Sequence, residues 1–287
     1  MAQTRTLQRR IRSVRNAKQI TKALEVVAAS RMRRVVAAVN GVRTYGEMAE
    51  QIMQRVAANP EVHSLPYFAP ASSGPTLYVI VTSDRGQAGA FNSNVFNLAI
   101  SSFQAEKTKP QVVVFGRKGS RFFSHLDGLE LRGTFEDIAD TPEANVFASL
   151  MDTIASGLAS GEFGQVKIIY TQFISSLAQK ATSFQLFPVQ PATDEAQASA
   201  KTVYEFEPEV QDVVEEAVRL YTEAKLIQAR IESAASEHAM RMVAMGNANR
   251  NATDLIDSLT LELNATRQAA ITQEIAEITG GAEALST

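Results

Sequence analysis

Hydrophobic residues recur at three- and four-residue steps along the first 58 residues of the chain. The repeat runs through Leu7, Ile11, Val14, Ala17, Ile20, Leu24, Val27, Ala28, Val35, Val39 and Val42. This spacing is that of one helix face, and no proline interrupts it before Pro60. We therefore predict one long N-terminal helix, which at about 1.5 Å per residue spans roughly 80 Å. Gly41 and Gly46 are its weak points, because each costs about 1 kcal/mol relative to alanine.

A second helical stripe occupies the C-terminal part of the chain. Its members are Val210, Val213, Val214, Ala217, Leu220, Tyr221, Ala224, Ile227, Ile231, Leu255, Leu259, Leu263, Ile271, Ile275 and Ile278. Pro208 and the acids at 205, 207, 209 and 212 suit a helix start. The pair Gly280-Gly281 predicts its end, and Gly246 with the stretch 247–251 marks possible interruptions.

Charge divides the chain into three parts. Residues 1–58 carry a net charge of +9, residues 59–202 a net −3, and residues 203–287 a net −9. Two long amphipathic helices of opposite charge predict a long antiparallel coiled coil, in which basic flanks face acidic ones. The alternative is two separate surface helices folded on the middle of the chain. We favour the coiled coil, because the middle is too small to cover both helices.

The middle part, residues 59–202, reads as a Rossmann-like α/β domain with a mostly parallel sheet. The predicted strands are 76–82, 111–116, 129–135, 165–173 and 181–189, with helices at 91–103, 117–125 and 143–160. Alternation of strands and helices is typical of a parallel sheet with covering helices. The last two strands are too close in sequence for a helical crossover, so they form an antiparallel hairpin. A polar linker follows at 190–202.

Composition excludes several classes of protein. The chain has no cysteine, so disulfides, thiolate catalysis and cysteine-zinc sites are ruled out. Its three histidines, at 63, 125 and 238, are far apart in sequence and do not support a clustered zinc site. The longest apolar runs have five residues, whereas a membrane span needs about 20. The net charge of −3 argues against a nucleic-acid coat.

The stretch from Ser83 to Asn92 is the most enzyme-like part of the chain. It follows the first strand and opens a helix, where open α/β sheets bind ligands. It is neither GxGxxG nor GxxxxGK[ST], and it lacks a phosphate-binding lysine. A structural loop is the favoured interpretation, and a nucleotide site is the alternative.

Other charged features have ordinary explanations beside functional ones. The basic run between Arg5 and Arg34 could grip phosphates, form a transit peptide, or face the acidic helix; we favour the last. The pairs Asp254/Asp257 and Glu274/Glu277 could serve acid–base chemistry, but a solvated helix face is favoured. His238, set among alanines and methionines, is interpreted as a surface or interface residue.

Three segments resemble a known family. The segment from Ile11 to Ser30 (IRSVRNAKQITKALEVVAAS) closely resembles the N-terminal helix of the gamma subunits of F-type ATP synthases. Ser83 to Gly86 (SDRG) with Phe91-Asn92 is similar to that family's central loop, although the common Cys-Gly-Gly stretch is absent. The segments 234–245 (AASEHAMRMVAM) and 265–284 (ATRQAAITQEIAEITGGAEA) resemble its C-terminal helix. The chain lacks the cysteine-bearing insert of the plastid branch, which points to a non-photosynthetic bacterial lineage.

The resemblance implies a non-catalytic rotor. The coiled coil would sit inside a ring of three alpha and three beta subunits. The middle domain would stand with the epsilon subunit on the proton-translocating c-ring, at the cytoplasmic face of the bacterial membrane. No catalytic residue, cofactor or metal ligand is expected. The residues implied to contact or couple to beta subunits are Arg267, Gln268, Thr272, Glu274 and Glu277, with Lys22 and Leu24 near the same bearing and Arg241 in a coupling role.

Two other functions remain open from the residues alone. A cytoplasmic coiled-coil adaptor would bind a partner and ignore membrane energisation. A phosphate-binding α/β enzyme would use residues 84–92 and bind nucleotide as an isolated chain.

Overall fold

The computed structural model describes residues 2–68, 74–190 and 209–285. The predicted linker 190–202 and the proposed helix-start residues 205, 207 and 208 therefore lie almost wholly outside the described residues. The chain forms two compact units. The central unit comprises Ala29–Arg241, and the terminal unit comprises Met1–Ala28 with Met242–Thr287. Each unit contains parts of both long helices, and each is described separately below.

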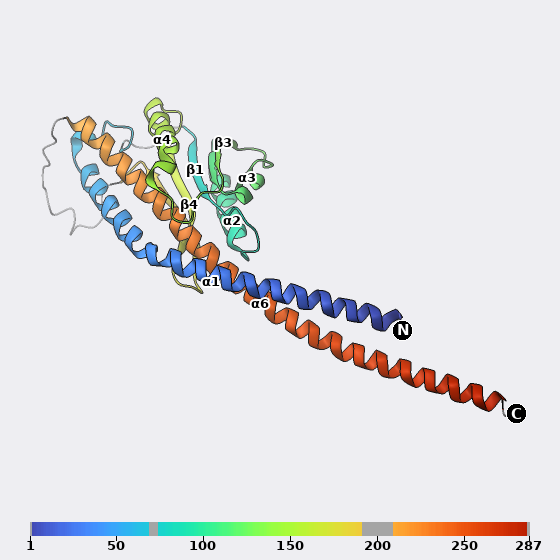
Figure 1. Cartoon of the computed structure of the whole chain (residues 1–287). Helices are drawn as coiled ribbons and strands as arrows, with labels where there is room; N and C mark the ends of the chain where they lie inside the picture. The colour runs from blue at the N-terminus through green and yellow to red at the C-terminus, as the bar shows by residue number, and fades with distance from the viewer. Residues whose placement is uncertain (1, 69–73, 191–208, 286–287) are drawn as a thin grey trace. The chain divides into compact units, whose positions relative to one another are not determined.

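A five-stranded sheet forms the middle of the central unit (Figure 1). Its strands are β1 (Thr76–Val81), β2 (Gln111–Phe115), β3 (Glu130–Phe135), β4 (Gln165–Phe173) and β5 (Gln179–Phe187). The strand order is β3-β2-β1-β4-β5, and only the β4–β5 pair is antiparallel. The predicted parallel sheet with a terminal hairpin is thereby confirmed. β5 begins and ends two residues earlier than predicted, because its pairing with β4 starts at the tight 174–178 connection.

Alternate residues of β1 fill two separate cores. Leu77, Val79 and Val81 belong to a cluster with α4 (Ala148–Ser160), the chain near Tyr67, and α6. Tyr78 and Ile80 belong to a cluster with α2 (Phe91–Gln104) and α3 (Arg117–Phe123). The sheet therefore has α2 and α3 on one face and α4 with α6 on the other, as the period of two in a buried strand requires (Figure 1). Short 3₁₀ turns at Pro60–Val62 and Ala144–Phe147 complete the central unit.

The two long helices are α1 (Ala2–Ala57) and α6 (Val210–Leu285). In the central unit Val35 and Val39 of α1 pack with Ile231, Ala234 and Ala235 of α6. Ion pairs join Arg43 to Glu232 and Glu50 to Lys225. Residue numbers therefore rise along α1 as they fall along α6, so the two helices are antiparallel. In the terminal unit Leu7 and Ile11 pack with Leu259. The predicted antiparallel pairing holds within each unit, and the alternative of two separate surface helices is wrong.

α6 differs from its predicted course in two places. It passes through Gly246 and residues 247–251 without a break, although these were the expected interruptions. It also continues through Gly280 and Gly281 to Leu285, so the predicted stop is wrong. A glycine permits the left-handed residue that ends a helix but does not impose it. Within the described residues no helix is long and apolar enough to cross a membrane.

Candidate functional site

The loop between β1 and α2 is held in one conformation by its own side chains. The backbone N–H of Ser83 donates to Asn92 Oδ1 at 3.1 Å, and Asn92 Nδ2 donates back to Ser83 Oγ at 2.8 Å. Ser83 Oγ also donates to the carbonyl of Arg85 at 2.7 Å. Gln87 and Gly89 have positive φ angles, which shape the turn into α2. The sequence resemblance in this loop thus coincides with a rigid turn, in agreement with the structural interpretation.

Asp84 joins this loop to the ends of the neighbouring strands. Its Oδ1 accepts the backbone N–H of Arg117 at 3.1 Å and that of Asp137 at 3.2 Å. The side chain of Arg117 in turn donates to the Asp137 carboxylate at 2.7 Å. Parallel strands bring their carboxyl ends to one edge of the sheet, which is why residues about 20 to 50 positions apart meet here. Asp84 is therefore committed to organising the loops rather than free for chemistry.

Arg241 of α6 grips the same loop. Its Nη2 donates to the carbonyls of Arg85 at 3.3 Å and Gly86 at 3.2 Å, and to Glu237 Oε1 at 2.6 Å. The guanidinium is planar with five donors, so it can serve a helix carboxylate and two loop carbonyls at once. The structure thus places Arg241 at a junction inside the central unit. Its implied role in coupling stays a prediction.

His238 is buried beside Arg241, with 2% of its surface exposed. The interpretation of this residue as a surface or interface residue is therefore wrong. Its Nε2 lies 2.8 Å from Asp140 Oδ2, and Arg241 Nη1 lies 3.3 Å from its Nδ1. The two contacts hold the imidazole ring between the Asp140 carboxylate and the Arg241 guanidinium.

Asp140 is the carboxylate that both His238 and Arg230 contact. Burial alone would raise the pKa of Asp140, but the hydrogen bond from His238 and the positive charges of Arg230 and Arg31 outweigh it and hold the pKa below its ordinary value. Arg230 donates to the carbonyl of Ile138 at 2.7 Å and lies 3.4 Å from Asp140 Oδ1. The loop after β3 is thereby tied to α6 through side chains that are about 90 residues apart in sequence.

A polar pocket of about 300 Å³ lies among these groups. Its lining contains four arginines and four carboxylates, namely Arg31, Arg85, Arg230, Arg241, Asp84, Asp137, Asp140 and Glu237, together with His238. The formal charges balance, so the pocket has no excess charge with which to hold an anion or a cation. Among the described residues no group of three or more His, Asp or Glu side chains is placed to bind a metal. The pocket therefore suits a mechanical junction between loops and helix better than a catalytic site.

A second polar layer, which sequence reasoning missed, lies between α1, α6 and β4. Glu232 accepts from Arg43 Nη2 at 3.1 Å, from the backbone N–H of Phe173 at 3.1 Å, and from Gln228 Nε2 at 3.0 Å. Arg43 also donates to the carbonyl of Phe173 at 2.8 Å. A polar residue within a helix–helix seam fixes the register of the pair. Arg43 lies in the predicted basic arm and Glu232 in the acidic arm, so the charge asymmetry was the available signal.

β4 supplies backbone groups to this layer because it extends beyond the end of its pairing with β1. β1 pairs with β4 only as far as Ile169. Beyond that point Thr171 donates its N–H to Ser233 Oγ at 3.1 Å, and its carbonyl accepts from Ser236 Oγ at 3.2 Å. The serines of the Ser-Ala-Ala-Ser segment thus act as the partner of a strand edge. α6 is joined to the sheet by directional hydrogen bonds as well as by apolar packing.

The predicted beta-contact residues fall into two groups in the terminal unit. Arg267, Gln268, Thr272, Glu274 and Glu277 are all exposed on the last third of α6. Lys22 is exposed and pairs with Glu25 at 3.2 Å, and Leu24 is half-buried. Glu25 lies beside Gly246, which is 21 residues before Arg267 and therefore about 30 Å from it along the helix. Lys22 and Leu24 therefore lie at a different level of the terminal unit from Arg267, and their implied place near the same bearing stays a prediction.

The end of α6 carries an apolar stripe with no cover among the described residues. Ile271, Ile275 and Ile278 are 48%, 59% and 72% exposed, and they recur at four- and three-residue spacing. Every described side chain from 271 to 279 is exposed. α1 begins at Ala2, and its first core residue, Leu7, packs against Leu259. The acid pairs Asp254/Asp257 and Glu274/Glu277 are likewise exposed, as expected of a solvated face.

A shallow groove lies in the terminal unit at the level of Ile256, well before this stripe along α6. Its volume is about 1060 Å³. Its lining combines the apolar Val26, Val27 and Ile256 with the basic Arg15, Lys18 and Lys22. Exposed apolar surface that is rimmed by charge is typical of a protein-binding surface.

Comparisons with known proteins agree with these observations. A sequence model of the ATP synthase family matches residues 3–285. The ATP synthase gamma chain of Symbiobacterium thermophilum is 38% identical over 283 residues, which is 98% of each chain. That of Pelotomaculum thermopropionicum is 36% identical over 285 residues, which is 99% of this chain and 100% of the relative.

Solved structures share the fold. A chain of the Tetrahymena thermophila mitochondrial ATP synthase central stalk and c-ring structure is 26% identical with a TM-score of 0.61, and the match covers 80% of this chain and 99% of that one. A chain from the Euglena gracilis enzyme shows the same fold at 18% identity and a TM-score of 0.69, covering 99% and 95%. On these matches, which extend over nearly its whole length, the chain belongs to the ATP synthase gamma chain family.

Proposed function

We propose that the chain is the central-stalk rotor subunit of a bacterial ATP synthase and transmits torque between a membrane proton ring and a ring of three alpha and three beta subunits. Membership of its family makes it a non-catalytic subunit, with ATP chemistry carried out elsewhere in the complex. The observation that carries the proposal is the exposed end of α6, where isoleucines at helical spacing lack any cover from α1. Such a stripe needs a surrounding protein surface, and an alpha–beta ring would provide one.

The contacts would act by shifting populations. A rotor orientation changes a nucleotide site only if it contacts the alternative states of that site differently. Changing the population ratio of two conformations of a site from 1:99 to 99:1 requires a difference of about 5.5 kcal/mol between the contact free energies of the two conformations. In this proposal Arg267, Gln268, Thr272, Glu274 and Glu277 provide contacts at the end of α6. The groove with Lys22 in its lining provides a second contact region, where acidic loops of beta subunits would be attracted.

The central unit would carry the load between the rotor helices and the membrane ring. We propose that it contacts the epsilon subunit and the c-ring at the cytoplasmic face of the membrane, as a peripheral protein. The junction around Asp140 and His238 and the layer around Glu232 support this role, because both tie α6 to the sheet and its loops through directional bonds. A load on α6 then reaches the sheet without rotation of one against the other.

Reconstitution tests the proposal directly. The full chain is mixed with alpha and beta subunits of a bacterial relative, and the intact mass of the product is measured together with ATP hydrolysis. The expected result is one copy of this chain with three alpha and three beta subunits, and hydrolysis that depends on the chain. Isolation from gently solubilised membranes should in addition recover epsilon and the membrane ring. Recovery of the chain alone, or with a single cytoplasmic partner, would favour the adaptor alternative instead.

A further inference from the structure

A row of exposed apolar side chains runs along α1 in the central unit. Tyr45, Met48 and Ile52 are 50%, 57% and 54% exposed. They stand at spacings of three and four residues, so they lie on one face of the helix. Single exposed apolar side chains are ordinary, whereas a contiguous row of them marks a surface that another protein covers.

This row belongs to a second seven-residue repeat of α1. The first repeat packs on α6 and the sheet, and its members are Val35, Val39, Val42, Gly46, Ala49, Met53 and Val56. The second repeat precedes each of these by one residue, and its members are Arg34, Ala38, Gly41, Tyr45, Met48, Ile52 and Arg55. One residue corresponds to about 100° around a helix, so the second face lies beside the seam with α6. A seven-residue repeat is the pattern that pairs one helix with another, and α1 therefore has a second face suited to a partner helix.

Gly41 gives an independent indication of a partner on this second face. Glycine is among the least favourable residues in a helix interior, so its presence there usually has a packing reason. At Gly46 the reason is internal, because a Cβ would collide with the Gln228 side chain of α6. At Gly41 a Cβ would meet nothing within 4 Å. No described neighbour explains Gly41, whereas a helix from outside the chain could approach α1 closely at this position.

Basic side chains stand at both ends of the second face. Arg34 and Arg55 are exposed, and neither forms an ion pair with a described residue. The acids in this stretch of α1 are Glu47 and Glu50, which stand outside the second repeat, and Glu50 is paired with Lys225. The face is therefore positive, and tyrosine, methionine and arginine are residues enriched at protein interfaces. It suits a partner that carries acids beside an apolar stripe.

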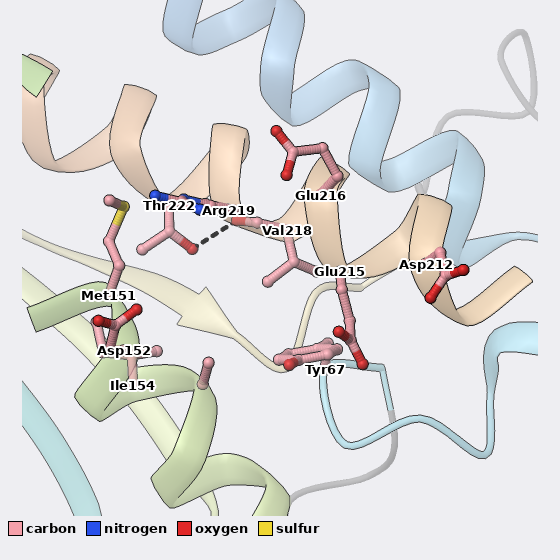
Figure 2. Close-up of a pocket in the computed structure, with 11 residues that line it drawn as sticks. Tyr67, Met151, Asp152, Ile154, Asp212, Glu215, Glu216, Val218, Arg219 and Thr222 are labelled. Atoms are coloured by element: carbon pink, nitrogen blue, oxygen red, sulfur yellow. Dashed lines mark hydrogen bonds between the residues drawn. The ribbon is translucent and has the colours of Figure 1, made fainter. Parts of the chain in front are cut away.

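A helix of another protein suits this face better than a segment of this chain does. The repeat runs from residue 34 to residue 55 and so covers 22 residues, or about 33 Å of helix. The longest internal stretch outside the described residues, 191–208, has 18 residues with a proline at each end, so it is too short. The same face of a second copy would bring arginines together. The acids Asp212, Glu215 and Glu216 around the pocket at the start of α6 (Figure 2) span only five residues.

We propose that the second face of α1 binds an acidic amphipathic helix of another subunit in the assembled complex. The apolar residues of that helix would cover the three exposed apolar side chains of α1. It would approach α1 most closely at Gly41, and its carboxylates would pair with Arg34 and Arg55. The identity of the partner as a subunit rests on the proposed function; the shape and charge of the face do not.

The first experiment identifies the occupant in the purified complex. Met48→p-benzoylphenylalanine is irradiated there, and the linked peptides are sequenced. Glu47→p-benzoylphenylalanine is the matched control, because this exposed neighbour points about 100° away. Met48 should link to a segment of another subunit that has apolar residues at three- and four-residue spacing with acids beside them, at least fivefold more strongly than Glu47. The proposal is overturned if Met48 links to nothing, only to this chain or a second copy of it, or to a segment without that pattern, or if both positions link equally.

The second experiment fills the open space at the glycine. Gly41→Leu adds a side chain to the second face, and Asn40→Leu adds the same side chain to an exposed neighbour outside the repeat. Neither variant should lower the urea midpoint of the isolated chain, since leucine is the better helix former. In the complex, Gly41→Leu should reduce the yield of the Met48 link at least tenfold, while Asn40→Leu leaves it unchanged. Equal link yields for the two variants would contradict close approach of a helix at Gly41 and so overturn the proposal.

A charge reversal tests the acidic character of the partner. Arg34→Glu should reduce the yield of the Met48 link at least threefold, whereas Arg33→Glu, an exposed neighbour outside the repeat, should leave it unchanged. If the two reversals act alike, the proposed partner is wrong. The test of the rotor function is separate: a purified complex without alpha and beta subunits would contradict that function, while a link from Met48 to an acidic helix of another protein in it would still support this inference.

Discussion

Replacing Arg43 by methionine removes the only cation that contacts Glu232 among the described residues. Arg43 makes two hydrogen bonds to that carboxylate, at 3.1 and 3.3 Å, and one to the carbonyl of Phe173 at 2.8 Å. The Glu232 side chain is 1% exposed, so the carboxylate cannot recover its hydration in place. It would keep its bonds from the Phe173 N–H and from Gln228. The variant therefore tests how much of the helix–sheet attachment depends on one buried ion pair.

The expected cost follows from this geometry. Breaking a buried ion pair from one side costs about 3–5 kcal/mol. Arg43 is 31% exposed and the carboxylate keeps two hydrogen bonds, so we expect about 2–3 kcal/mol. For a domain of about 150–250 residues this corresponds to a lowering of the melting temperature by about 5–10 °C. Arg43→Lys keeps the charge but not the fork of donors, and it should cost about 1–2 kcal/mol.

Urea unfolding followed by circular dichroism measures this change. Arg34→Met is the matched control, because Arg34 is an exposed arginine on the same helix with no ion pair to a described residue. It should change stability by no more than about 0.5 kcal/mol. If Arg43→Met and Arg34→Met unfold at the same urea concentration, the reasoning that the polar layer holds α1 and α6 to the sheet is refuted.

Three further predictions concern other parts of the chain. Ala269→Trp puts a bulky ring on the exposed end of α6 and should slow ATP turnover of the reconstituted complex. Unchanged turnover would argue against the proposal that this end of α6 turns within a closely fitting ring of alpha and beta subunits. Gly116 has φ of +94°, and a Cβ there would lie 2.5 Å from the Thr82 carbonyl oxygen. Gly116→Ala should therefore lose about 2–3 kcal/mol by urea unfolding, whereas Gly133→Ala, where a Cβ meets nothing within 4 Å, should stay within about 1 kcal/mol. The pKa of Asp140 is lowered in the folded chain, so its contribution to stability is present above about pH 4 and is lost as the pH falls through the folded value. Asp140→Asn should be less stable at pH 7 and lose less between about pH 5 and 3; parallel pH profiles for the two chains would contradict this.

Local sequence patterns were sufficient for the elements of the fold. The continuous apolar run of β1 and the alternation of strands and helices predicted the parallel sheet, because a strand buried on both faces has few other compositions. The helical stripes and the opposite charges of the two arms predicted the antiparallel pair. The end of α6 was mispredicted because a glycine pair is only a local preference, and the helix continues through it.

The site could be predicted only in part, because its contacts join distant segments. His238 and Asp140 are 98 residues apart, and nothing near His238 in sequence indicates a carboxylate partner. Gly46 looked like a weak point in α1, yet a Cβ there would collide with the Gln228 side chain, which is supplied by α6. The levels of Lys22 and Arg267 along the helices depend on the register of α1 against α6, which a hydrophobic repeat does not determine.

The distance in sequence between α1 and α6 also determines how long α1 remains without its partner during translation. Lys225, the ion-pair partner of Glu50, follows it by 175 residues in the chain. At about 5–20 residues per second, Lys225 is added roughly 9–35 seconds after Glu50. During that time the apolar stripe of α1 has left the ribosome while its partner α6 has not been synthesised. Ser233 and Ser236, which bind the backbone of β4 at Thr171, have not been synthesised either. An uncovered stripe and an open strand edge are the surfaces on which nascent chains aggregate. Newly made chains should therefore depend on holding chaperones until translation is nearly finished, and a chain truncated before α6 should be insoluble rather than merely inactive.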